Sequence, residues 1–396
     1  MPKTVQNHAV SSQSSRAIDP TKLLARLQHR QEEMVGRLRA LVELESPSHN
    51  KHAVDELGRY LGEQFERAGA RVQFHRTSEF GDHLQADFAG DGSRKPILLL
   101  GHFDTVWDIG TLRTMPFRVA DGRAYGPGTF DMKGGIVQGM GAIQVLSESG
   151  LPRPVTVFLV TDEEVGSQSS RAITEELAKK SAAVLVLEPS HGAKGALKTA
   201  RKGVGDFTVT VRGHAAHSGL DFEKGHSAII ELARQIIAIE KFTDLERGIT
   251  VNPGIIQGGT RTNVIAAEAT AHMDARVQRL QDAAHVEQLF RSLKPVNPHC
   301  TIEVEGGINR PPLERTTSVV ALFEQARAIA KTLGWSLTEA AVGGGSDGNF
   351  TGALGIPTLD GLGAVGEGAH AVNESLVIDE MPRRAALVAS LIAQIP

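Results

Sequence analysis

Histidine and acidic side chains stand at or shortly after the ends of the short apolar segments of this 396-residue sequence, where buried strands would end. They are His102 and Asp104 after PILLLG (96–101), Asp162, Glu163 and Glu164 after VTVFLV (155–160), Glu188 at the end of AVLVLE (183–188), and Glu367 and His370 after IPTLDGLG (356–363). Asp131 lies in the glycine-rich stretch YGPGTFDMKGG. In open α/β sheets, ligands bind in the crevice beyond the carboxyl ends of the strands. We therefore expect these side chains to converge on one site.

The chemistry that these residue types favour is metal binding. Buried carboxylates are costly unless they are paired or bound to a metal, and we expect no buried Lys or Arg beside them. The single cysteine, Cys300, excludes a cysteine-based zinc site, so a metal would need some of the 15 histidines and the carboxylates. Taken singly, each residue has an ordinary explanation as a structural histidine, a helix cap or a surface acid. Their convergence favours a pair of metal ions that share a carboxylate.

Alternating apolar segments and amphipathic stretches predict the elements that would position these residues. Helices are expected at about 20–44, with Asp19 as the N-cap and Pro20 in the first turn, and at 53–68, 317–333 and 381–394. Strands are expected at 71–75, 96–101, 155–160 and 183–188. This pattern is typical of an α/β fold with a mostly parallel sheet covered by helices.

The pattern of predicted strands and helices changes at about residue 201. Strands at 203–211, 248–257, 264–277 and 300–307, with helices at about 226–241 and 282–293, follow the order β-α-β-β-α-β of a ferredoxin-like α+β unit. We therefore expect a discontinuous catalytic domain formed by 19–200 and 312–396, with an inserted lid or dimerisation domain at 201–311. Residues 1–18 are expected to be a flexible tail.

Composition narrows the class of protein. Lys and Arg total 42 and Asp and Glu total 46, so the net charge is −4; a general nucleic-acid binder would carry a basic excess. No segment reaches the roughly 18 apolar residues of a membrane helix, and the first 18 residues lack the apolar stretch of a secretory signal. We expect a cytoplasmic protein without a nucleic-acid or membrane partner.

The ordered motifs resemble those of the co-catalytic dizinc aminoacylase/carboxypeptidase family, and their spacing is most similar to its glutamate carboxypeptidase (carboxypeptidase G) branch. The motifs are GHFDTV, YGPGTFDMKGG, TDEEVGS, LEPS, RGHAAHSG, NVIAAEATAHMDAR, GGGSDGNF and GLGAVGEGAH, and the resemblance covers the chain from about residue 35. It implies two Zn²⁺ ions per subunit, with Co²⁺ or Mn²⁺ as possible substitutes. Asp131 would bridge the two ions, His102 and Glu188 would complete one site, and Glu164 and His370 the other.

The same resemblance implies roles for neighbouring residues. Glu163 matches the family's catalytic base, which would take a proton from a metal-bound water and return it to the leaving amine. Asp104 matches the acid that orients the metal-binding histidine. The peptide bond between Asp131 and Met132 is expected to be cis, as in the family.

The inserted domain would supply substrate contacts. His217 matches an oxyanion-stabilising histidine that reaches the partner's active site in a homodimer, although a surface or interface histidine is the ordinary alternative. Asn263 and Arg276 match substrate-binding residues, and Arg276 and Arg310 could hold a carboxylate bidentately. For Arg310 a solvated hinge residue is an equal alternative. The glycine-rich loop with Gly345 and Ser346 is expected to line the pocket.

These motifs favour zinc-dependent hydrolysis of an amide bond to a C-terminal, glutamate-like amino acid. N-acyl-amino-acid deacylases, aminoacylases and dipeptidases of the same family share the metal motifs and remain alternatives, as does an inactive ligand-binding relative. A GxGxxG match at Gly361, Gly363 and Gly366 would indicate a dinucleotide site, but too little chain follows it for a βαβ unit.

Overall fold

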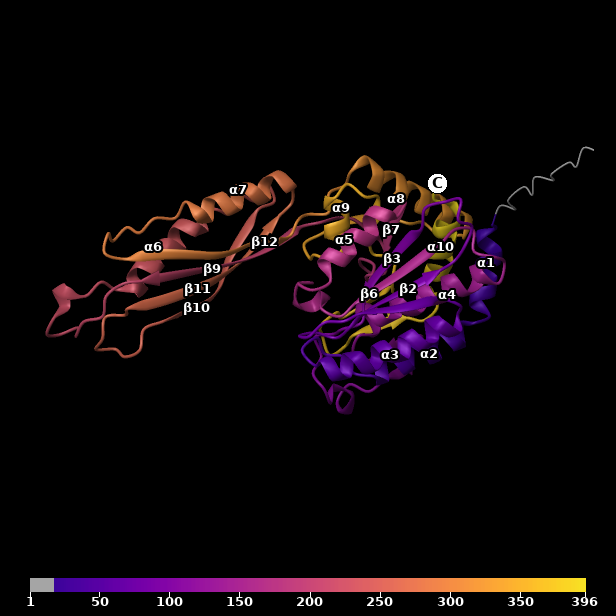
Figure 1. The fold of residues 1–396 in the computed structure, drawn as a ribbon, viewed down its shortest axis with the longest axis horizontal. Coiled ribbons are helices and arrows are strands. Elements are labelled where there is room, and N and C mark those ends of the chain that lie inside the picture. Colours follow the sequence, from indigo (N-terminus) through magenta and orange to yellow (C-terminus); the bar gives the residue numbers. More distant parts are fainter. Residues whose placement is uncertain (1–17) are drawn as a thin grey trace, which may run out of the picture.

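The structure, a computed structural model, describes residues 18–396, which form a larger α/β unit and a smaller elongated unit beside it (Figure 1). All but the last residue of the predicted N-terminal tail lies outside the described residues. The larger unit is formed by the segments before and after the smaller one, so the chain leaves it and returns.

A six-stranded sheet forms the centre of the larger unit. Its strands, in spatial order, are β1 (Arg71–His75), β2 (His83–Phe88), β6 (Val155–Val160), β3 (Ile97–His102), β7 (Ala183–Val186) and β14 (Thr358–Leu359). The last four are parallel to one another, whereas β1 and β2 pair antiparallel at one edge. The predicted mostly parallel sheet is confirmed, and β2 is a strand that the sequence pattern did not predict.

Helices cover both faces of this sheet. One face, with Ile97 and Leu99, packs in a large core with α1 (Pro20–Gln28), α2 (Gln31–Glu43), α3 (Lys51–Arg67), α4 (Gly134–Ser147), α8 (Thr317–Thr332) and α10 (Glu380–Gln394). The other face, with Leu98 and Leu100, packs on α5 (Arg171–Lys180), and α9 (Gly348–Ala353) lies against α5. Because both faces are covered, every residue of β3 is buried. This explains the uninterrupted apolar run that predicted the strand.

The single helix predicted at about 20–44 is two helices in the structure. The side chain of Asp19 caps the first at the amide of Thr21, and Pro20 occupies its first turn. The chain turns at His29 and Arg30, so that α1 packs on α10 while α2 packs on α4. The apolar spacing is continuous across the turn because both helices pack against the same core.

Short strands that the sequence did not predict complete the larger unit. β8 (Leu197–Arg201) pairs with β13 (Glu339–Val342), and β4 (Arg118–Ala120), β5 (Arg123–Tyr125), β16 (Ser375–Val377) and β15 (Gly366–Glu367) form a separate small sheet. β16 pairs with β5 and β15. The segment between β15 and β16, which contains His370, is therefore attached to the part of the chain that leads into Asp131.

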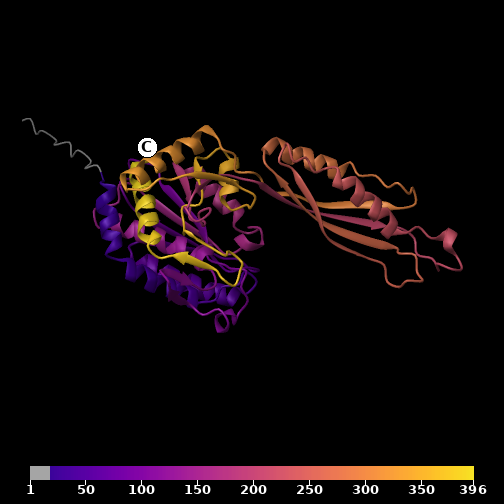
Figure 2. The same ribbon diagram turned by 180° about the vertical axis from the view of Figure 1, so that it is seen from behind.

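The smaller unit, which we call the lid, has the predicted β-α-β-β-α-β order. It comprises β9 (Gly203–Arg212), α6 (Ala228–Glu240), β10 (Thr250–Gly258), β11 (Glu268–Val277), α7 (Leu280–Arg291) and β12 (Thr301–Arg310). The antiparallel sheet has the order β10-β11-β9-β12, and it has its own core, in which Phe207 stacks on Phe290. Both helices lie on one face, and the lid extends away from the larger unit, joined through the ends of β9 and β12 (Figures 1 and 2).

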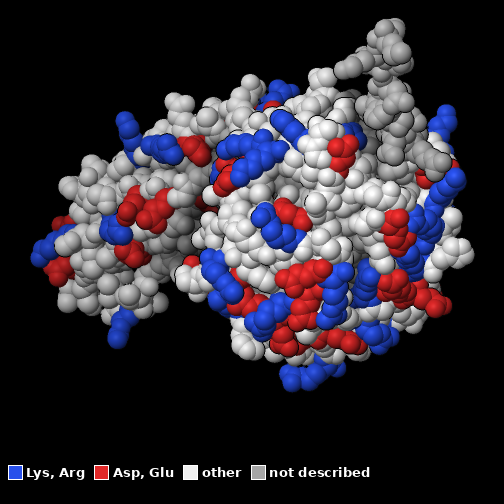
Figure 3. Space-filling model, turned by 45° about the vertical axis from the view of Figure 1, so that its right-hand side comes forward, with Lys and Arg blue, Asp and Glu red and all other residues white. Residues whose placement is uncertain are grey.

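Acidic and basic side chains are mixed over the lower part of the larger unit on the face shown in Figure 3. Within residues 18–396, none of the helices has the length and apolar character that crossing a bilayer would require.

Candidate metal centre and active site

Five of the predicted ligand residues form two groups that share one aspartate. In the first group, His102 Nε2 lies 3.3 Å from Asp131 Oδ1 and 3.4 Å from Glu188 Oε1. In the second, His370 Nε2 lies 3.5 Å from Asp131 Oδ2 and 3.2 Å from Glu164 Oε2. The two oxygens of Asp131 thus face different histidines.

Strand ends and tight turns place these side chains. His102 is the last residue of β3, Glu188 follows β7, and Glu164 lies in a single 3₁₀ turn after β6. Asp131 lies in an irregular turn before α4, and its peptide bond to Met132 is cis, as predicted. His370 has a positive φ of 62°, which is uncommon for a residue with a Cβ and occurs preferentially at functional sites.

Asp104 orients the imidazole ring of His102 through contacts with Nδ1, the ring nitrogen that faces away from the other predicted ligands. His102 Nδ1 lies 3.1 Å from the carbonyl oxygen of Asp104 and 3.4 Å from its Oδ1. The other carboxylate oxygen of Asp104 accepts hydrogen bonds from Ser48 Oγ at 2.7 Å and from the amide of Glu164 at 3.3 Å. With Nδ1 occupied in this way, Nε2 is the ring nitrogen that faces Asp131 and Glu188.

The electrostatics of the cluster favour cations. Burial lowers the pKa of His102, but contacts with Asp104, Asp131 and Glu188 outweigh burial and hold that pKa well above its usual range. Contacts with Asp131 and Glu164 raise the pKa of His370 to about 10. The same acidic side chains that favour a proton on each histidine would also favour a metal ion at these positions.

The donor set fits a pair of metal ions. Among the described residues, Asp131 Oδ1 is buried and accepts no hydrogen bond; His102 Nε2, 3.3 Å away, is itself a predicted metal ligand, so this oxygen is left for a cation. Tetrahedral coordination with bonds of about 2.0–2.1 Å separates ligand atoms by roughly 3.3 Å, and the histidine–carboxylate distances of 3.2–3.5 Å match that separation. Nitrogen and oxygen donors with no sulfur suit Zn²⁺, Co²⁺ or Mn²⁺.

Glu163 lies next to this cluster and is held by Arg310. Burial raises the pKa of the Glu163 carboxyl well above its usual range, although Arg310 and His102 act in the opposite direction. Arg310 Nη2 lies 3.1 Å from Glu163 Oε1 and also donates to the Glu163 carbonyl oxygen at 2.8 Å. A buried carboxyl with a raised pKa is suited to accepting a proton near neutral pH and returning it.

Arg310 is not a solvated hinge residue. It is 5% exposed, and its Nη1 lies 2.6 Å from Asp347 Oδ1 while Nη2 donates to Ser167 Oγ at 2.8 Å. The guanidinium is thus already engaged by Glu163 and Asp347, so binding a substrate carboxylate would require it to share these partners. Arg310 still lines the cleft above the metal ligands.

The expectation that no basic side chain is buried beside the acidic cluster was wrong. Arg201, at the end of β8, is buried and lies 2.9 Å from Glu188 Oε2 and 2.8 Å from both oxygens of Asp360. Lys198 Nζ is 3.9 Å from the same Glu188 oxygen. Glu188 therefore presents one oxygen to His102 and the other to Arg201.

A cleft of about 810 Å³ between the larger unit and the lid opens onto these residues. Glu163, Glu164 and His370 line one wall, and the lid contributes Arg276 and Asp274. Arg276 forms a bidentate ion pair with Asp274, with Nε–Oδ1 and Nη2–Oδ2 distances of 2.9 and 2.7 Å.

One residue of the glycine-rich loop lines the cleft and the next is buried in the core. Gly345 lines the cleft. Ser346 is buried and donates to Asp360 Oδ2 at 2.6 Å, so it holds the loop in place rather than lining the cleft. Glu367 is also away from the metal ligands, since it is exposed and pairs with Arg123.

His217 and Asn263 do not join this site within one chain. Both are exposed and lie in loops beyond the ends of β9 and β11 that are farthest from the larger unit, where the amide of Ser218 donates to the Asn263 carbonyl. The ten residues of β9 separate them from the cleft, which corresponds to about 30 Å of extended chain. Neither residue lines the cleft.

Sequence reasoning missed several buried groups that hold the site. Arg201, Asp347 and Glu374 have polar contacts to the predicted residues, and these partners lie 13, 37 and 243 residues away in the sequence. Glu374 had a signal in the sequence, because this acidic residue stands four positions after His370 and just before the apolar run 376–378.

An open α/β sheet with two ligand groups that share a carboxylate at its strand ends is the arrangement of co-catalytic metal hydrolases. The chain belongs to peptidase family M20/M25/M40, whose model matches residues 98–394. The predicted family is thereby confirmed, and the protein is a hydrolase of a metallopeptidase and amidohydrolase family.

Relatives within the family differ in their described activities. Carboxypeptidase G2 of Pseudomonas sp. (strain RS-16) is 30% identical over 91% of this chain and 88% of its own length. Acetylornithine deacetylase of Myxococcus xanthus is 31% identical over 54% of this chain and 58% of its own. The solved structure of Bacillus subtilis YXEP protein, described as a dinuclear metal binding peptidase, is 14% identical, with a TM-score of 0.68, and covers 92% of this chain and 98% of its own.

Proposed function

We propose that this protein is a dizinc hydrolase that cleaves the amide bond to a C-terminal, glutamate-like amino acid. The observation that carries the proposal is the pair of His–carboxylate groups sharing Asp131, with Glu163 beside them. When bound, the metals would polarise the amide carbonyl and lower the pKa of a water molecule. Glu163 would accept the proton of that water and deliver it to the leaving amine.

Substrate preference is proposed from the cleft and from the branch of the family. Arg276 is a guanidinium on the lid wall of the cleft, and exchanging its partner Asp274 for a substrate carboxylate would keep a bidentate pair. The similarity to carboxypeptidase G2 over most of both chains supports cleavage next to a C-terminal amino acid. The similarity to an acetylornithine deacetylase supports N-acyl-amino-acid deacylation as the second candidate.

A homodimer formed through the lid is part of the proposal. β10 is an edge strand of the lid sheet, most of its residues are exposed, and α6 lies beside it. Ile230 and Ile237, seven residues apart on α6, and Ile256 on β10 are 55%, 62% and 58% exposed. An edge strand with adjacent apolar side chains is suited to pairing with the same strand of a second copy about a twofold axis.

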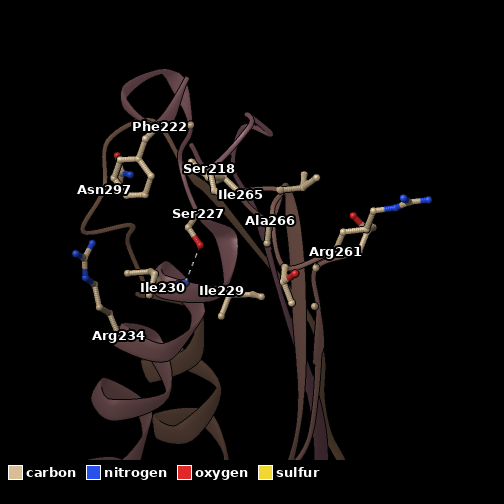
Figure 4. A pocket seen from close by; sticks show the side chains of 16 residues that line it. Ser218, Phe222, Ser227, Ile229, Ile230, Arg234, Arg261, Ile265, Ala266 and Asn297 are labelled. Carbon is tan, nitrogen blue, oxygen red and sulfur yellow. Dashed lines mark hydrogen bonds between the residues drawn. The ribbon is translucent and has the colours of Figure 1, made fainter. Parts of the chain in front are cut away.

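A hollow with apolar side chains at the tip of the lid also supports the proposed homodimer. Its volume is about 870 Å³, and Ile229, Ile230 and Ile265 are among its lining residues (Figure 4). The hydroxyl of Ser227 caps α6 at the amide of Ile230 and fixes this end of the helix. The hollow adjoins the segments of His217 and Asn263, so a dimer through this surface would place both residues at the boundary between subunits.

A substrate panel tests the proposed reaction. Folyl-glutamates, other N-acyl amino acids and dipeptides would be incubated with the protein reconstituted with Zn²⁺, Co²⁺ or Mn²⁺, and amino acid release would be measured. We expect the highest kcat/KM for substrates that release an acidic amino acid. Preferential deacetylation of N-acetyl amino acids would establish the second candidate, and absence of hydrolysis with every metal would contradict both.

A further inference from the structure

Glu374 is a buried carboxylate that joins three segments of the candidate metal site. Its Oε1 accepts hydrogen bonds from the amides of Phe130 and Asp131, at 2.9 and 3.0 Å. Its Oε2 accepts from the amide of Gly128 at 2.8 Å and from Trp107 Nε1 at 2.9 Å. The side chain is 1% exposed, so these four donors are its surroundings rather than water.

The three segments are those that carry predicted ligands. Trp107 lies in the loop after His102 and Asp104, the three amides belong to the turn that contains Asp131, and Glu374 follows His370 by four residues. The turn is also held by the main chain, since the amide of Gly126 donates to the Glu374 carbonyl at 3.3 Å. One residue thus ties the segment of His370 to the turn of Asp131 by side chain and backbone together.

A tight turn between Gly368 and Glu374 places the Glu374 side chain beside the turn that contains Asp131. Gly368 has a positive φ of 81°, and a Cβ there would lie 2.9 Å from the amide nitrogen of Glu374. The chain therefore folds tightly between Gly368 and Glu374, with His370 at the outer end of the turn. Movement of the Glu374 carboxylate would displace both Asp131 and His370, which share the second ligand group.

We propose that Glu374 is a positioning residue for the dinuclear centre, which sets the spacing between Asp131 and His370 without binding metal itself. This inference rests on the proposed function, because it presupposes that two metal ions bind. An ionised carboxylate has acceptor sites for all four donors. A glutamine in its place would accept at one oxygen only and would turn its NH₂ group toward two of the N–H donors.

Metal binding by Glu374→Gln is the decisive measurement. The apoprotein would be titrated with Zn²⁺ in competition with a chromophoric chelator, and the visible spectrum of the Co²⁺-loaded protein would be recorded. We expect at least one of the two metal ions to bind about 10–100-fold more weakly to Glu374→Gln than to the wild type, which is the usual effect of removing a residue that orients ligands. We also expect the Co²⁺ spectrum of the variant to differ from that of the wild type.

Glu231→Gln is a matched control. Glu231 is a fully buried carboxylate in the lid that accepts from the amides of Val296 and Asn297, at 2.8 and 2.9 Å. Its replacement removes the same charge and disturbs the same kind of hydrogen bonds away from the metal ligands. We expect it to lower the free energy of unfolding while leaving metal affinity and the Co²⁺ spectrum unchanged.

Trp107→Phe keeps the test decisive if Glu374→Gln does not fold. It removes one of the four donors and retains an aromatic ring, and we expect metal affinity to fall by a few fold, as loss of one hydrogen bond predicts. Wild-type affinity and spectrum in every folded variant of Glu374 and Trp107 would overturn the role of Glu374. Failure of the wild-type protein to bind two metals would instead refute the proposed dinuclear centre.

Discussion

Arg310 holds both ends of Glu163, since its Nη2 lies 3.1 Å from the carboxylate oxygen Oε1 and 2.8 Å from the carbonyl oxygen of the same residue. Arg310 is the last residue of β12, where the lid returns to the larger unit. The candidate base is therefore attached to a connection between the two units, and its protonation depends on a residue from the end of the lid.

Replacing Arg310 by Gln should move the acid limb of the pH profile to higher pH. Arg310 lowers the pKa of Glu163, and activity falls as pH falls through that pKa because the base must be deprotonated. Loss of the cation raises the pKa by about 1 unit or more. The measurement is kcat/KM against pH, with Arg310→Lys as the charge-preserving control. If the acid limb of Arg310→Gln is not shifted, Glu163 is not the group whose deprotonation the reaction requires.

Glu163→Gln should retain metal and lose turnover. Glu163 belongs to neither ligand group, so its replacement leaves the donor set intact while removing the proton acceptor. General acid–base catalysis contributes about 10²–10⁴-fold, and we expect a loss of kcat of at least that size. Metal content and kcat would be measured on the same preparation, with Glu164→Gln as the variant that should lose metal. Near-normal turnover by Glu163→Gln would refute the assignment of the base.

Hybrid dimers should reveal whether His217 acts on the partner's site. Glu163→Gln and His217→Ala would each be inactive as pure dimers. In a statistical mixture, half of the dimers are hybrids, and each hybrid has one site with both residues intact if His217 acts across the interface. About a quarter of wild-type activity should therefore return on mixing. Activity that stays at the level of the separate variants would place His217 outside catalysis in trans.

Arg276→Ala should raise KM for substrates with a free α-carboxylate. The guanidinium lines the cleft and is partly exposed, so it is accessible to a substrate. Loss of a charge-assisted pair is expected to cost about 1.5–3 kcal/mol, or roughly 10–150-fold in KM. The matched substrates are the same compounds with the carboxylate amidated, whose KM should change little. An equal change for both sets would show that Arg276 has no role in carboxylate binding.

Local patterns predicted the main strands and the residues at their ends. The uninterrupted apolar run of β3 results from burial on both faces, and His102 and Glu188 are identified by their places at the end of β3 and at the end of the AVLVLE run. The order of the lid elements was also predictable, because alternating strands and amphipathic helices are properties of contiguous sequence.

Features that depend on distant partners were not predictable in this way. β16 is three residues long and is defined by pairing with β5, where Ser375 faces Tyr125. Arg201 is buried beside Asp360 and Glu188, which neutralise it and lie 159 and 13 residues away in the sequence. The glycine-rich loop predicted that Ser346 lines the pocket, but its hydroxyl donates to the buried Asp360 instead. Local patterns in a single sequence do not indicate which distant residues will pair.

The two ends of the lid lie side by side, since Val204 of β9 pairs with Arg310 of β12. A domain whose ends adjoin can be inserted or exchanged with little disturbance of its host, so a chimera with another lid needs only two cuts. The position of the second cut decides the outcome. A cut before Arg310 keeps the native partner of Glu163 in the recipient, whereas a cut after it imports the donor's residue, so lid exchange can transfer the pH response of catalysis together with the binding surface.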